Sequence, residues 1–559
     1  MGKTRALVAR LPLRLRGAAG ALGRLSRDRS IWRELAPLAL PLAMALWLRQ
    51  AVADFAHGHV FRDTNMFDYA AWCMLHGERI YDRVATPDGP LVYILHAALQ
   101  LVAPGSDDSA YRRVDLVCET LVAITITLLV TPRAPVQRLV WLRRATWAVV
   151  GGSLWLAKMV EFDFPASTQR ESFYVTLGML GLVLVYASAD FSRRTATFML
   201  WGGAYVVGWL AFGKQTLLVW SGLIVLAALL LPHNPDQPRA FRLKAVLGGI
   251  GLAMASAVAF IAIFGSLRGY WFWCFKYNYL YYQFHDALAP HDILTEDFVR
   301  DYFFAAALSL AGGLAAVMVG ALPVRSVVLA VAPMANVGAA VAQVHGWRYH
   351  FVPAAFSAVF FFVYALAMAW TATSKDDAKR EPRTLAAMGL TVLLAWPTLQ
   401  QLLAAPWLHE SEEHQGDPVV TDPHDAGRVL ASFTRPDDRV FYFGDDPATP
   451  FDARRLPATP YIVAWMLDFH RGIREGYMAP SARLLAARDA MQRGLVADAC
   501  KTLAQAPPAL AIRDDSVGFK GKGLDYLLKL CPELAPVLSQ RYRTLEVGSV
   551  HLYIRDDRP

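Results

Sequence analysis

Charged residues are scarce in this sequence, and the deficit is confined to one part of it. The 559 residues are 18% charged and 55% hydrophobic, whereas a soluble chain carries about 25% charged residues. Long apolar runs alternate with short basic patches up to about residue 404, and the composition beyond is that of an ordinary soluble domain. The sequence therefore excludes a wholly soluble protein and predicts a membrane domain followed by a globular tail.

Cysteine is also scarce, and the arrangement of the five cysteines excludes several kinds of site. The two cysteines of the tail form no CxxC pair and have no histidine partner at metal-ligand spacing. Cys500 and Cys531 lie in the tail. If the tail is periplasmic, they either form a disulfide or remain two buried free thiols. The tail has no nucleotide-binding glycine pattern, and we find no repeat or low-complexity tract.

The amino-terminal segment lacks the features of a cleavable signal peptide. Residues 1–33 are rich in Arg and have no compact apolar core followed by small residues. We therefore expect a basic cytoplasmic arm before the first membrane span. The net charge of +8 does not indicate a nucleic-acid partner, because Arg and Lys lie in short loops beside apolar spans, which is the orientation signal of membrane proteins.

Eleven apolar segments are each close to the roughly 20 residues that cross the hydrocarbon layer. They are 34–50, 113–131, 145–160, 172–189, 197–213, 216–232, 245–266, 303–322, 327–344, 350–371 and 385–404. The segment 90–104 is bounded by Pro90 and Pro104 and is short for a span. We expect it to form a helix that lies on or dips into the outer surface.

The positions of the basic residues favour this count of eleven. With the amino terminus inside, the loops that we expect in the cytoplasm contain clusters of Arg and Lys. These are Arg133, Arg138, Arg143 and Arg144, then Arg193 and Arg194, then Arg239, Arg242 and Lys244, and finally Lys375, Lys379, Arg380 and Arg383. Counting 90–104 as a span would move the later clusters outside. An odd number of spans places the tail in the periplasm.

The expected fold class is a mainly α, polytopic membrane protein of about 11 transmembrane helices with outer-face helices and a small C-terminal α/β periplasmic domain. The membrane domain spans 34–404, with long outer loops at 51–112 and 267–302, and the periplasmic domain spans 405–559. We expect strands at 439–445, 508–514 and 551–557, and helices at 422–434, 480–494 and 523–538. In the second outer loop, the aromatic run GYWFWCFKYNYLYYQFH predicts an interfacial helix whose rings lie at headgroup depth.

The first outer loop carries the most informative pattern, FRDTNMFDYAAWCMLHGERIYDRVATPDGPLVYILHAAL. Apolar residues at helical spacing predict a helix that docks on the membrane domain and begins at Asp63. These residues are Phe67, Ala70, Ala71, Met74 and Leu75. Asp63 then lies near the bilayer surface, where it is either a helix N-cap or a functional carboxylate.

This loop resembles the first periplasmic loop of GT-C-type glycosyltransferases, which include protein O-mannosyltransferases, lipid A aminoarabinose transferases and polyprenyl-phosphomannose-dependent mannosyltransferases. The shared pattern is an Asp, an aromatic residue, small residues, a Gly, Tyr-Asp and a Pro-rich turn. Here it is Asp63, Phe67, Ala70-Ala71, Gly77, Tyr81-Asp82 and Gly89-Pro90. The resemblance implies that Asp63 is the catalytic base, that the donor is a polyprenyl-phosphate sugar and that the anomeric centre is inverted. Thr64 follows Asp63, so the family variant with two adjacent acids is absent, and Asp68 is the candidate second carboxylate.

The expected topology gathers further polar residues at the outer face, where ionisable groups at membrane depth are costly unless paired or functional. Lys214 and Arg348 are the candidates for binding the donor phosphate, and Tyr349 and His350 accompany them. Lys214 alone is as readily explained by snorkelling to headgroups. His345 and His350 lack a clear third ligand, so a divalent metal is not indicated and no cofactor is predicted.

Other polar residues of these outer segments are candidates for contacts with the sugar or the acceptor. They are Asp68, Tyr81, Asp82, Asp88, Arg170, Glu171 and His345. For Arg170 and Glu171 a structural ion pair is the favoured alternative.

The sequence thus predicts a glycosyltransferase of the bacterial inner membrane that moves a sugar from a polyprenyl-phosphate donor to a hydroxyl of an envelope glycan, lipid or protein. A secondary transporter or flippase would show internal repeats and charges at the bilayer midplane, which the sequence does not. An O-antigen ligase or polymerase would rely on a large late loop. A non-catalytic assembly protein on a GT-C scaffold would tolerate loss of Asp63.

Overall fold

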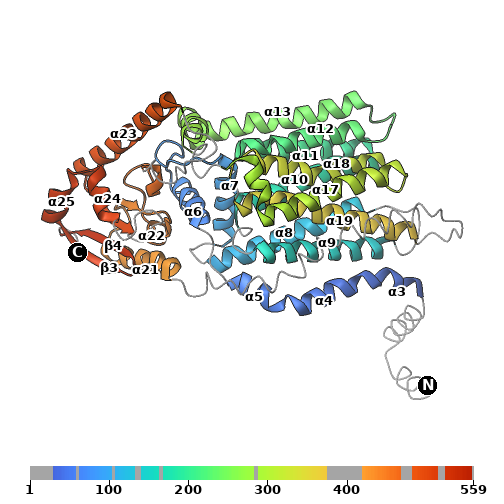
Figure 1. Cartoon of the computed structure of the whole chain (residues 1–559), viewed down its shortest axis with the longest axis horizontal. Helices are drawn as coiled ribbons and strands as arrows, with labels where there is room; N and C mark the ends of the chain where they lie inside the picture. Colours follow the sequence, from blue (N-terminus) through green and yellow to red (C-terminus); the bar gives the residue numbers. More distant parts are fainter. Residues whose placement is uncertain are drawn as a thin grey trace, which may run out of the picture.

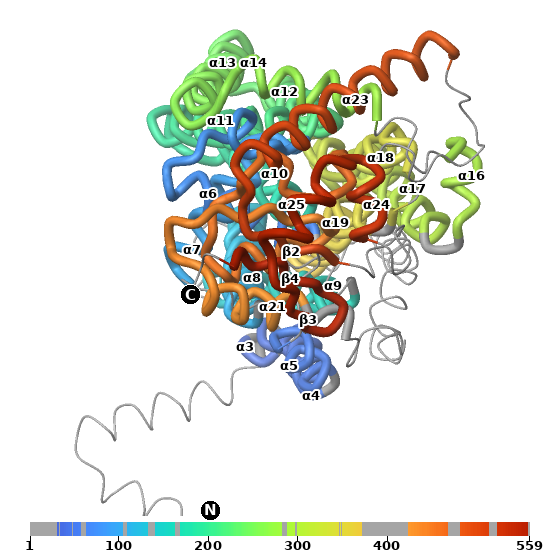
Figure 2. The backbone as a smooth tube through the Cα atoms, turned by 90° about the vertical axis from the view of Figure 1, so that its left-hand side faces the viewer, coloured from blue at the N-terminus to red at the C-terminus, as the bar shows by residue number. Residues whose placement is uncertain are grey.

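The computed structural model describes residues 29–57, 62–103, 108–131, 140–162, 168–281, 288–345, 347–373, 418–467, 481–513 and 523–556. A bundle of long helices makes up one part of the molecule, and a smaller lobe of helices and strands caps one end of it (Figure 1). Figure 2 looks onto that end, with β2, β3, β4 and α23 in front of the bundle. The predicted basic arm falls almost entirely outside the described residues.

Nearly parallel helices form the bundle. They are α3 (Arg29–Leu35), α4 (Ala39–Trp47), α5 (Arg49–His57), α8 (Asp108–Val130), α9 (Val140–Phe162), α10 (Arg170–Ala187), α11 (Arg193–Gly213), α12 (Leu218–Leu230), α13 (Arg239–Phe264), α17 (Asp297–Met318), α18 (Val327–Val341) and α19 (Val352–Thr373). Each predicted span coincides with one of these helices, or for 34–50 with the bent α4–α5 pair, except 385–404, which lies outside the described residues.

Six of the described helices are long and apolar enough to cross a membrane, namely α10, α11, α13, α17, α18 and α19. A seventh span results if α4 and α5, which meet at a bend of 56°, are counted as one. The long helix α8 differs from these because it carries buried charged residues, Arg112, Asp115 and Glu119. The chain is therefore a multi-pass membrane protein by the length and composition of its helices.

At the lobe end, two shorter helices pack across the bundle. They are α6 (Arg62–Leu75) and α7 (Pro90–Val102), which confirm the helices predicted at Asp63 and in 90–104. Gly77 ends α6 in the left-handed region with φ +89°. The turn before α7 passes so close to α11 that a Cβ at Gly89 would lie 1.5 Å from the Phe212 carbonyl oxygen. Glycine is required there, and it brings the first outer loop against the end of α11.

The aromatic run of the second outer loop forms a continuous helical segment, as predicted, with a π-helical turn at its centre. The segment consists of α14 (Leu267–Trp271), the π-helical turn (Phe272–Tyr277) and α15 (Asn278–Leu280). Several of its rings pack on the lobe: Tyr281 stacks on Trp465 at 6.1 Å, and Trp273 meets Tyr461 edge to face at 6.2 Å. These rings join the lobe to the bundle.

The lobe is built on one four-stranded sheet of order β1-β2-β4-β3, with β1 parallel to β2 and the other pairs antiparallel. Its strands are β1 (Val440–Phe443), β2 (Ala509–Arg513), β3 (Tyr542–Val547) and β4 (Val550–Arg555). Its helices are α21 (Pro418–Phe433), α22 (Ala448–Asp452), α23 (Ala482–Gln505), α24 (Gly523–Leu530) and α25 (Leu534–Arg541). The α/β prediction is confirmed, as are three of its strands. The helix predicted at 523–538 is divided around Pro532, the second residue after α24.

The lobe rests on α6. Asn65 donates a hydrogen bond from Nδ2 to Asp446 Oδ1 at 2.9 Å, and the Tyr69 hydroxyl donates to the Arg455 carbonyl at 2.8 Å. The loop after α6 adds a backbone bond from Ala85 N to the Pro460 carbonyl at 2.7 Å. Because Asn65 and Asp446 are both buried, their bond stabilises the position of α6 against the lobe.

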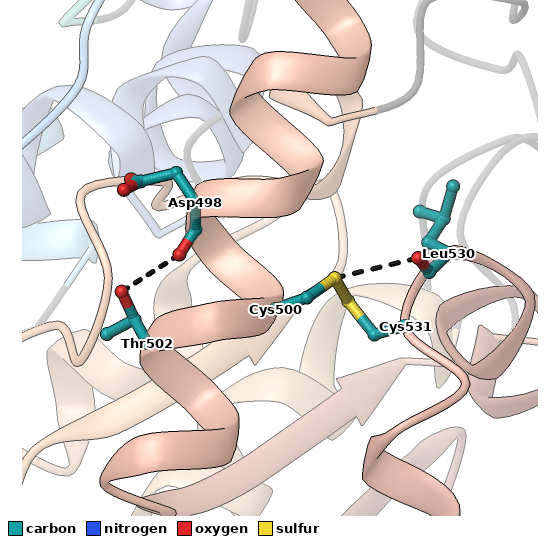
Figure 3. The surroundings of a disulfide bond; sticks show 5 residues. All are labelled: Asp498, Cys500, Thr502, Leu530 and Cys531. Atoms are coloured by element: carbon teal, nitrogen blue, oxygen red, sulfur yellow. Dashed lines mark hydrogen bonds between the residues drawn. A yellow bond between two sulfur atoms is a disulfide. The ribbon is translucent and has the colours of Figure 1, made fainter.

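Cys500 of α23 and Cys531 after α24 form a disulfide (Figure 3). Their separation of 31 residues closes a loop whose entropic contribution to stability is about 3 to 4 kcal/mol. We expect reduction, or Cys500→Ser, to lower the melting temperature of the lobe, measured by thermal unfolding with and without dithiothreitol. Cys118→Ser, at an exposed free cysteine, is the control and should leave it unchanged. Alkylation of both Cys500 and Cys531 without reductant would contradict the pairing.

Candidate active site

A cavity of about 380 Å³ opens where the first outer loop meets the ends of the bundle helices. Its wall comes from the turn before α7, the start of α10, the α11–α12 junction, α15 and the segment between α18 and α19. The lining residues are Pro87, Asp88, Gly89, Arg170, Gly213, Lys214, Gln215, Thr216, Asn278, Tyr279, Ala342, Gln343, Val344, His345, Trp347 and His350. Segments far apart in the sequence therefore bring two cations and two histidines to one cavity.

The two cations belong to a chain of four charged side chains. Lys214 Nζ lies 2.6 Å from Glu171 Oε1, and Arg170 Nε lies 3.0 Å from the same oxygen. Arg170 is also paired with Asp88. All four side chains are at least four-fifths buried, so the charges are strongly coupled and their loss is costly. The expected Arg170–Glu171 ion pair is confirmed, and it extends to Lys214 and Asp88.

Lys214 directly follows α11, and its side chain is buried between charges of both signs. Burial and the charge of Arg170 lower the pKa of Lys214 to about 8, against the opposing effects of Glu171 and, more weakly, Asp63. The electrostatic contribution of Asp63 to this pKa shows that the two side chains lie in one neighbourhood. Lys214 is thus a cation at neutral pH and loses its charge when the pH rises past about 8.

This pKa predicts how anion binding by the cavity depends on pH. Because Lys214 is protonated below about pH 8, its attraction for an anion is fully present at pH 6.5 and is lost as the pH rises past 8. We expect the affinity for undecaprenyl phosphate in detergent to fall between pH 7 and 9. The Lys214→Met variant serves as the control, and its affinity should depend less on pH over the same range. Identical profiles for the two proteins would rule out Lys214 as the titrating group.

Asp63 lies in the first turn of α6 and is half-buried. Its neighbour Thr64 is buried and accepts a hydrogen bond from Gln169 Nε2 at 3.0 Å. Since Gln169 directly precedes Arg170, the start of α6 is tied to the charged chain of the cavity. Asp63 itself is not one of the residues that line the cavity.

The predicted site residues between α18 and α19 include two histidines that reach the cavity. His345 and His350 are buried and line the cavity, and Trp347 between them stacks on His345 with 4.5 Å between ring centroids. Tyr349 packs edge to face on His350 at 4.5 Å and is not part of the cavity wall. The side chain of Arg348 lies outside the described residues, so its predicted phosphate contact stays a prediction. No group of three or more His, Cys, Asp and Glu side chains within the described part of the chain could hold a metal ion.

Three of the predicted sugar or acceptor contacts lie elsewhere. Asp68 of α6 is buried and bonds to His96 at 2.8 Å. Tyr81, with φ +66°, donates its hydroxyl hydrogen to the Asp88 carbonyl at 2.8 Å and so holds the turn. Asp82, the next residue, is exposed to solvent and does not line the cavity. Asp68 and Tyr81 therefore shape the loop and have no access to the cavity.

Five polar cavity residues were not singled out by the sequence, namely Gln215, Thr216, Asn278, Tyr279 and Gln343. Asn278 Nδ2 donates to the Pro87 carbonyl at 2.9 Å, which ties α15 to the turn before α7. Gln215 directly follows the predicted site residue Lys214, so its position in the sequence could have indicated that it lines the cavity. Asn278 and Tyr279 lie in an aromatic run that was interpreted as a membrane anchor.

No protein-family model and no curated sequence matches this chain. Solved structures are similar to it along almost the whole length. ArnT from Cupriavidus metallidurans bound to undecaprenyl phosphate matches with a TM-score of 0.55 and 12% identity, covering 92% of this chain and 97% of that one. The apo form of the same protein gives a TM-score of 0.53.

A weaker similarity is to the archaeal oligosaccharyltransferase AglB from Archaeoglobus fulgidus in complex with an inhibitory peptide and a dolichol-phosphate, with a TM-score of 0.44 and 11% identity over 93% of this chain and 74% of that one. At such identities a similarity establishes the fold and not the reaction. ArnT, a lipid A aminoarabinose transferase, is a GT-C enzyme. The similarity to ArnT therefore shows that the chain has a GT-C-type fold.

Proposed function

We propose that this protein is a membrane glycosyltransferase that transfers a sugar from a polyprenyl-phosphate donor to a hydroxyl of an envelope glycan, lipid or protein. The observation that carries the proposal is the cavity in which Lys214 and Arg170 lie beside His345 and His350, with Asp63 at the start of α6, which Thr64 joins to Gln169 next to Arg170. The similarity in fold to ArnT bound to undecaprenyl phosphate supports the choice of donor.

Lys214 and Arg170 are the proposed ligands of the donor phosphate. Lysine supplies a point charge and arginine a fork that matches phosphate oxygens. In the structure both cations are held by Glu171 and Asp88, so a phosphate would share or displace these carboxylates. Arg348 and His350 remain proposed phosphate contacts. Arg170 is thus added to the phosphate ligands that were predicted from the sequence.

Asp63 is the proposed general base. Its carboxylate accepts the proton of the acceptor hydroxyl, and the hydroxyl oxygen forms a bond to the anomeric carbon. The bond from that carbon to the lipid phosphate oxygen breaks, and the phosphate keeps the electron pair. Cations at the phosphate stabilise the charge that develops there. Direct displacement on one face inverts the anomeric centre.

We further propose that the cavity and the lobe face the periplasm across a bacterial inner membrane, with eleven spans and the domains 34–404 and 405–559. The Cys500–Cys531 disulfide supports this orientation, because disulfides persist in oxidising compartments. Labelling of a cysteine introduced at Ser432, an exposed residue of α21, with a membrane-impermeant maleimide tests it in intact spheroplasts. Labelling only after lysis would overturn the orientation.

The experiment that tests the function compares envelope glycans of wild type and a deletion strain by mass spectrometry. The expected result is a loss of one sugar mass from a glycan, lipid or protein in the deletion strain, restored by the wild-type chain. This mass identifies the sugar and the acceptor together. Unchanged glycans, with undecaprenyl-linked sugars redistributed across the membrane, would instead favour a transporter or flippase.

A further inference from the structure

His96 is an imidazole that the proposed reaction does not use, although it is fully buried beside the site. It belongs to α7 and lies between α6 and the turn that precedes α10. Its Nδ1 is 2.8 Å from Asp68 Oδ1, and its Nε2 is 3.0 Å from the Thr168 carbonyl oxygen. Both ring nitrogens therefore face an oxygen at hydrogen-bond distance.

The nature of these two oxygens sets the protonation of the pair. A carbonyl oxygen only accepts, so Nε2 must carry a hydrogen and donate it to Thr168. Nδ1 faces a carboxylate oxygen, and a bond there needs a second hydrogen, held on Nδ1 or shared with Asp68. The pair thus holds one proton more than a neutral imidazole beside a free carboxylate. Burial favours this state, because a buried carboxylate that lacks a donor is costly.

The two bonds of His96 join the two parts of the candidate site. Asp68 is on α6, the helix that begins with Asp63, and Thr168 lies two residues before Arg170. Thr168 has φ +52°, a conformation that needs support in a residue with a side chain. Its backbone N donates to Asp115 Oδ2 at 2.7 Å, and its carbonyl accepts from His96. Its peptide groups are therefore fixed on both sides.

We propose that His96 is a positioning residue of this enzyme, which in its doubly protonated state holds the Asp63-bearing helix α6 in register with the Arg170–Glu171 end of the cavity. The inference rests on the proposed function for its catalytic meaning. Its physical content, a proton-dependent link between α6 and residues 168–171, stands on the geometry of the described residues. His96 touches no reacting group and acts through Asp68 and Thr168.

The charges around His96 come from every element packed against it. Asp68 faces it from α6, and Asp115 of α8 acts on it and on Arg112 of the same helix. Arg454 of the lobe is close enough to act on Asp68. On its remaining sides the ring meets Phe67 and Phe173 with centroids 5.5 and 5.7 Å away. Of these charged groups, Asp68 is the one that contacts the His96 ring directly.

The first test is spectroscopic and independent of activity. The full-length protein in detergent is labelled with ¹⁵N-histidine, and His96 is assigned from the signal that disappears in His96→Gln. We expect both ring nitrogens of His96 to be protonated at pH 7. In Asp68→Asn we expect one of them to lose its proton at the same pH, because the counter-charge is gone. A wild-type spectrum with one unprotonated ring nitrogen at pH 7 would overturn the proposal.

The second test reads the link itself by hydrogen exchange of the backbone amides at 168–173. We expect Asp68→Asn and His96→Gln to speed exchange there by about tenfold or more, as loss of a buried charge-assisted hydrogen bond predicts. The affinity for undecaprenyl phosphate should fall in the same variants. His76→Gln is the control, since His76 bonds only locally to the Trp72 carbonyl at 2.8 Å and should leave both measurements unchanged.

The outcomes separate the two proposals. If wild-type protein fails to bind undecaprenyl phosphate at any pH while His96 is doubly protonated and its variants loosen residues 168–173, the proposed function fails and the link stands. If binding is intact and exchange at 168–173 is the same in all variants, the link fails and the proposed function stands.

Discussion

Asp63→Asn is expected to lower sugar transfer by about 100- to 10,000-fold, the usual contribution of one general base. The amide keeps the size of the carboxylate and the start of α6, but it cannot accept a proton from the acceptor hydroxyl. Donor binding should be nearly unchanged at pH 6.5. The measurement is the amount of modified glycan in the deletion strain complemented with each variant, beside undecaprenyl-phosphate affinity of the purified protein.

The choice of pH matters for this variant because Asp63 helps to keep Lys214 charged. Removing the carboxylate lowers the pKa of Lys214 further below about 8, so near pH 8 the variant would also bind the donor less well. At pH 6.5 Lys214 stays protonated in both proteins, and the loss of transfer then reports the base alone.

The matched control is Asp54→Asn, at an exposed carboxylate of the preceding helix α5 that accepts a hydrogen bond from Gln50 at 2.8 Å. Its transfer should equal that of wild type. Asp63→Glu retains a base at a shifted position, and we expect partial activity. Normal transfer by Asp63→Asn would remove Asp63 as the base and favour a non-catalytic protein on a GT-C scaffold.

Hydropathy and charge predicted the membrane part well because each span depends on local composition. The helices α10, α11 and α13 follow directly from apolar runs between basic clusters. The π-helical turn in the aromatic run could not be predicted in this way. Nor could the contacts of this segment with the rings of Tyr461 and Trp465, which are almost 200 residues away in sequence. In the lobe, β3 was missed because an edge strand with a mostly exposed face lacks a clear apolar alternation.

The sequence allowed several residues of the candidate site to be predicted, but not the ion pairs and hydrogen bonds that they form with one another. Lys214 and Glu171 stood out as costly charges at the ends of apolar spans, but nothing local in the sequence pairs them across the 43 residues between them. Asp88 and Asp68 were both candidates for contacts with the sugar or the acceptor. The structure pairs Asp88 with Arg170, and Asp68 bonds to a histidine of α7. Partners of buried charges depend on which helix ends meet, which is a property of the fold.

Substitutions at Lys214 and at Glu171 are expected to change the affinity for undecaprenyl phosphate in opposite directions. Lys214→Met keeps the length of the side chain and removes its charge, and we expect the affinity for undecaprenyl phosphate to fall by about 10- to 100-fold, as loss of a hydrogen bond to a charged group predicts. Glu171→Gln removes the carboxylate that holds both Lys214 and Arg170. The cations are then available to the phosphate, so we expect tighter binding at pH 6.5.

Glu171→Gln is expected to lower the thermal stability of the protein, although it strengthens phosphate binding. Without Glu171 the two buried cations repel each other when the cavity is empty, because Arg170 already acts on Lys214. We therefore expect Glu171→Gln to melt at a lower temperature and to be restored by undecaprenyl phosphate more than wild type is. Lys276→Met, at an exposed lysine over the Phe272 ring, is the control for general loss of positive charge at this end of the molecule. If Lys214→Met and Lys276→Met weaken binding equally, the lipid is attracted by overall charge and the cavity is not its site.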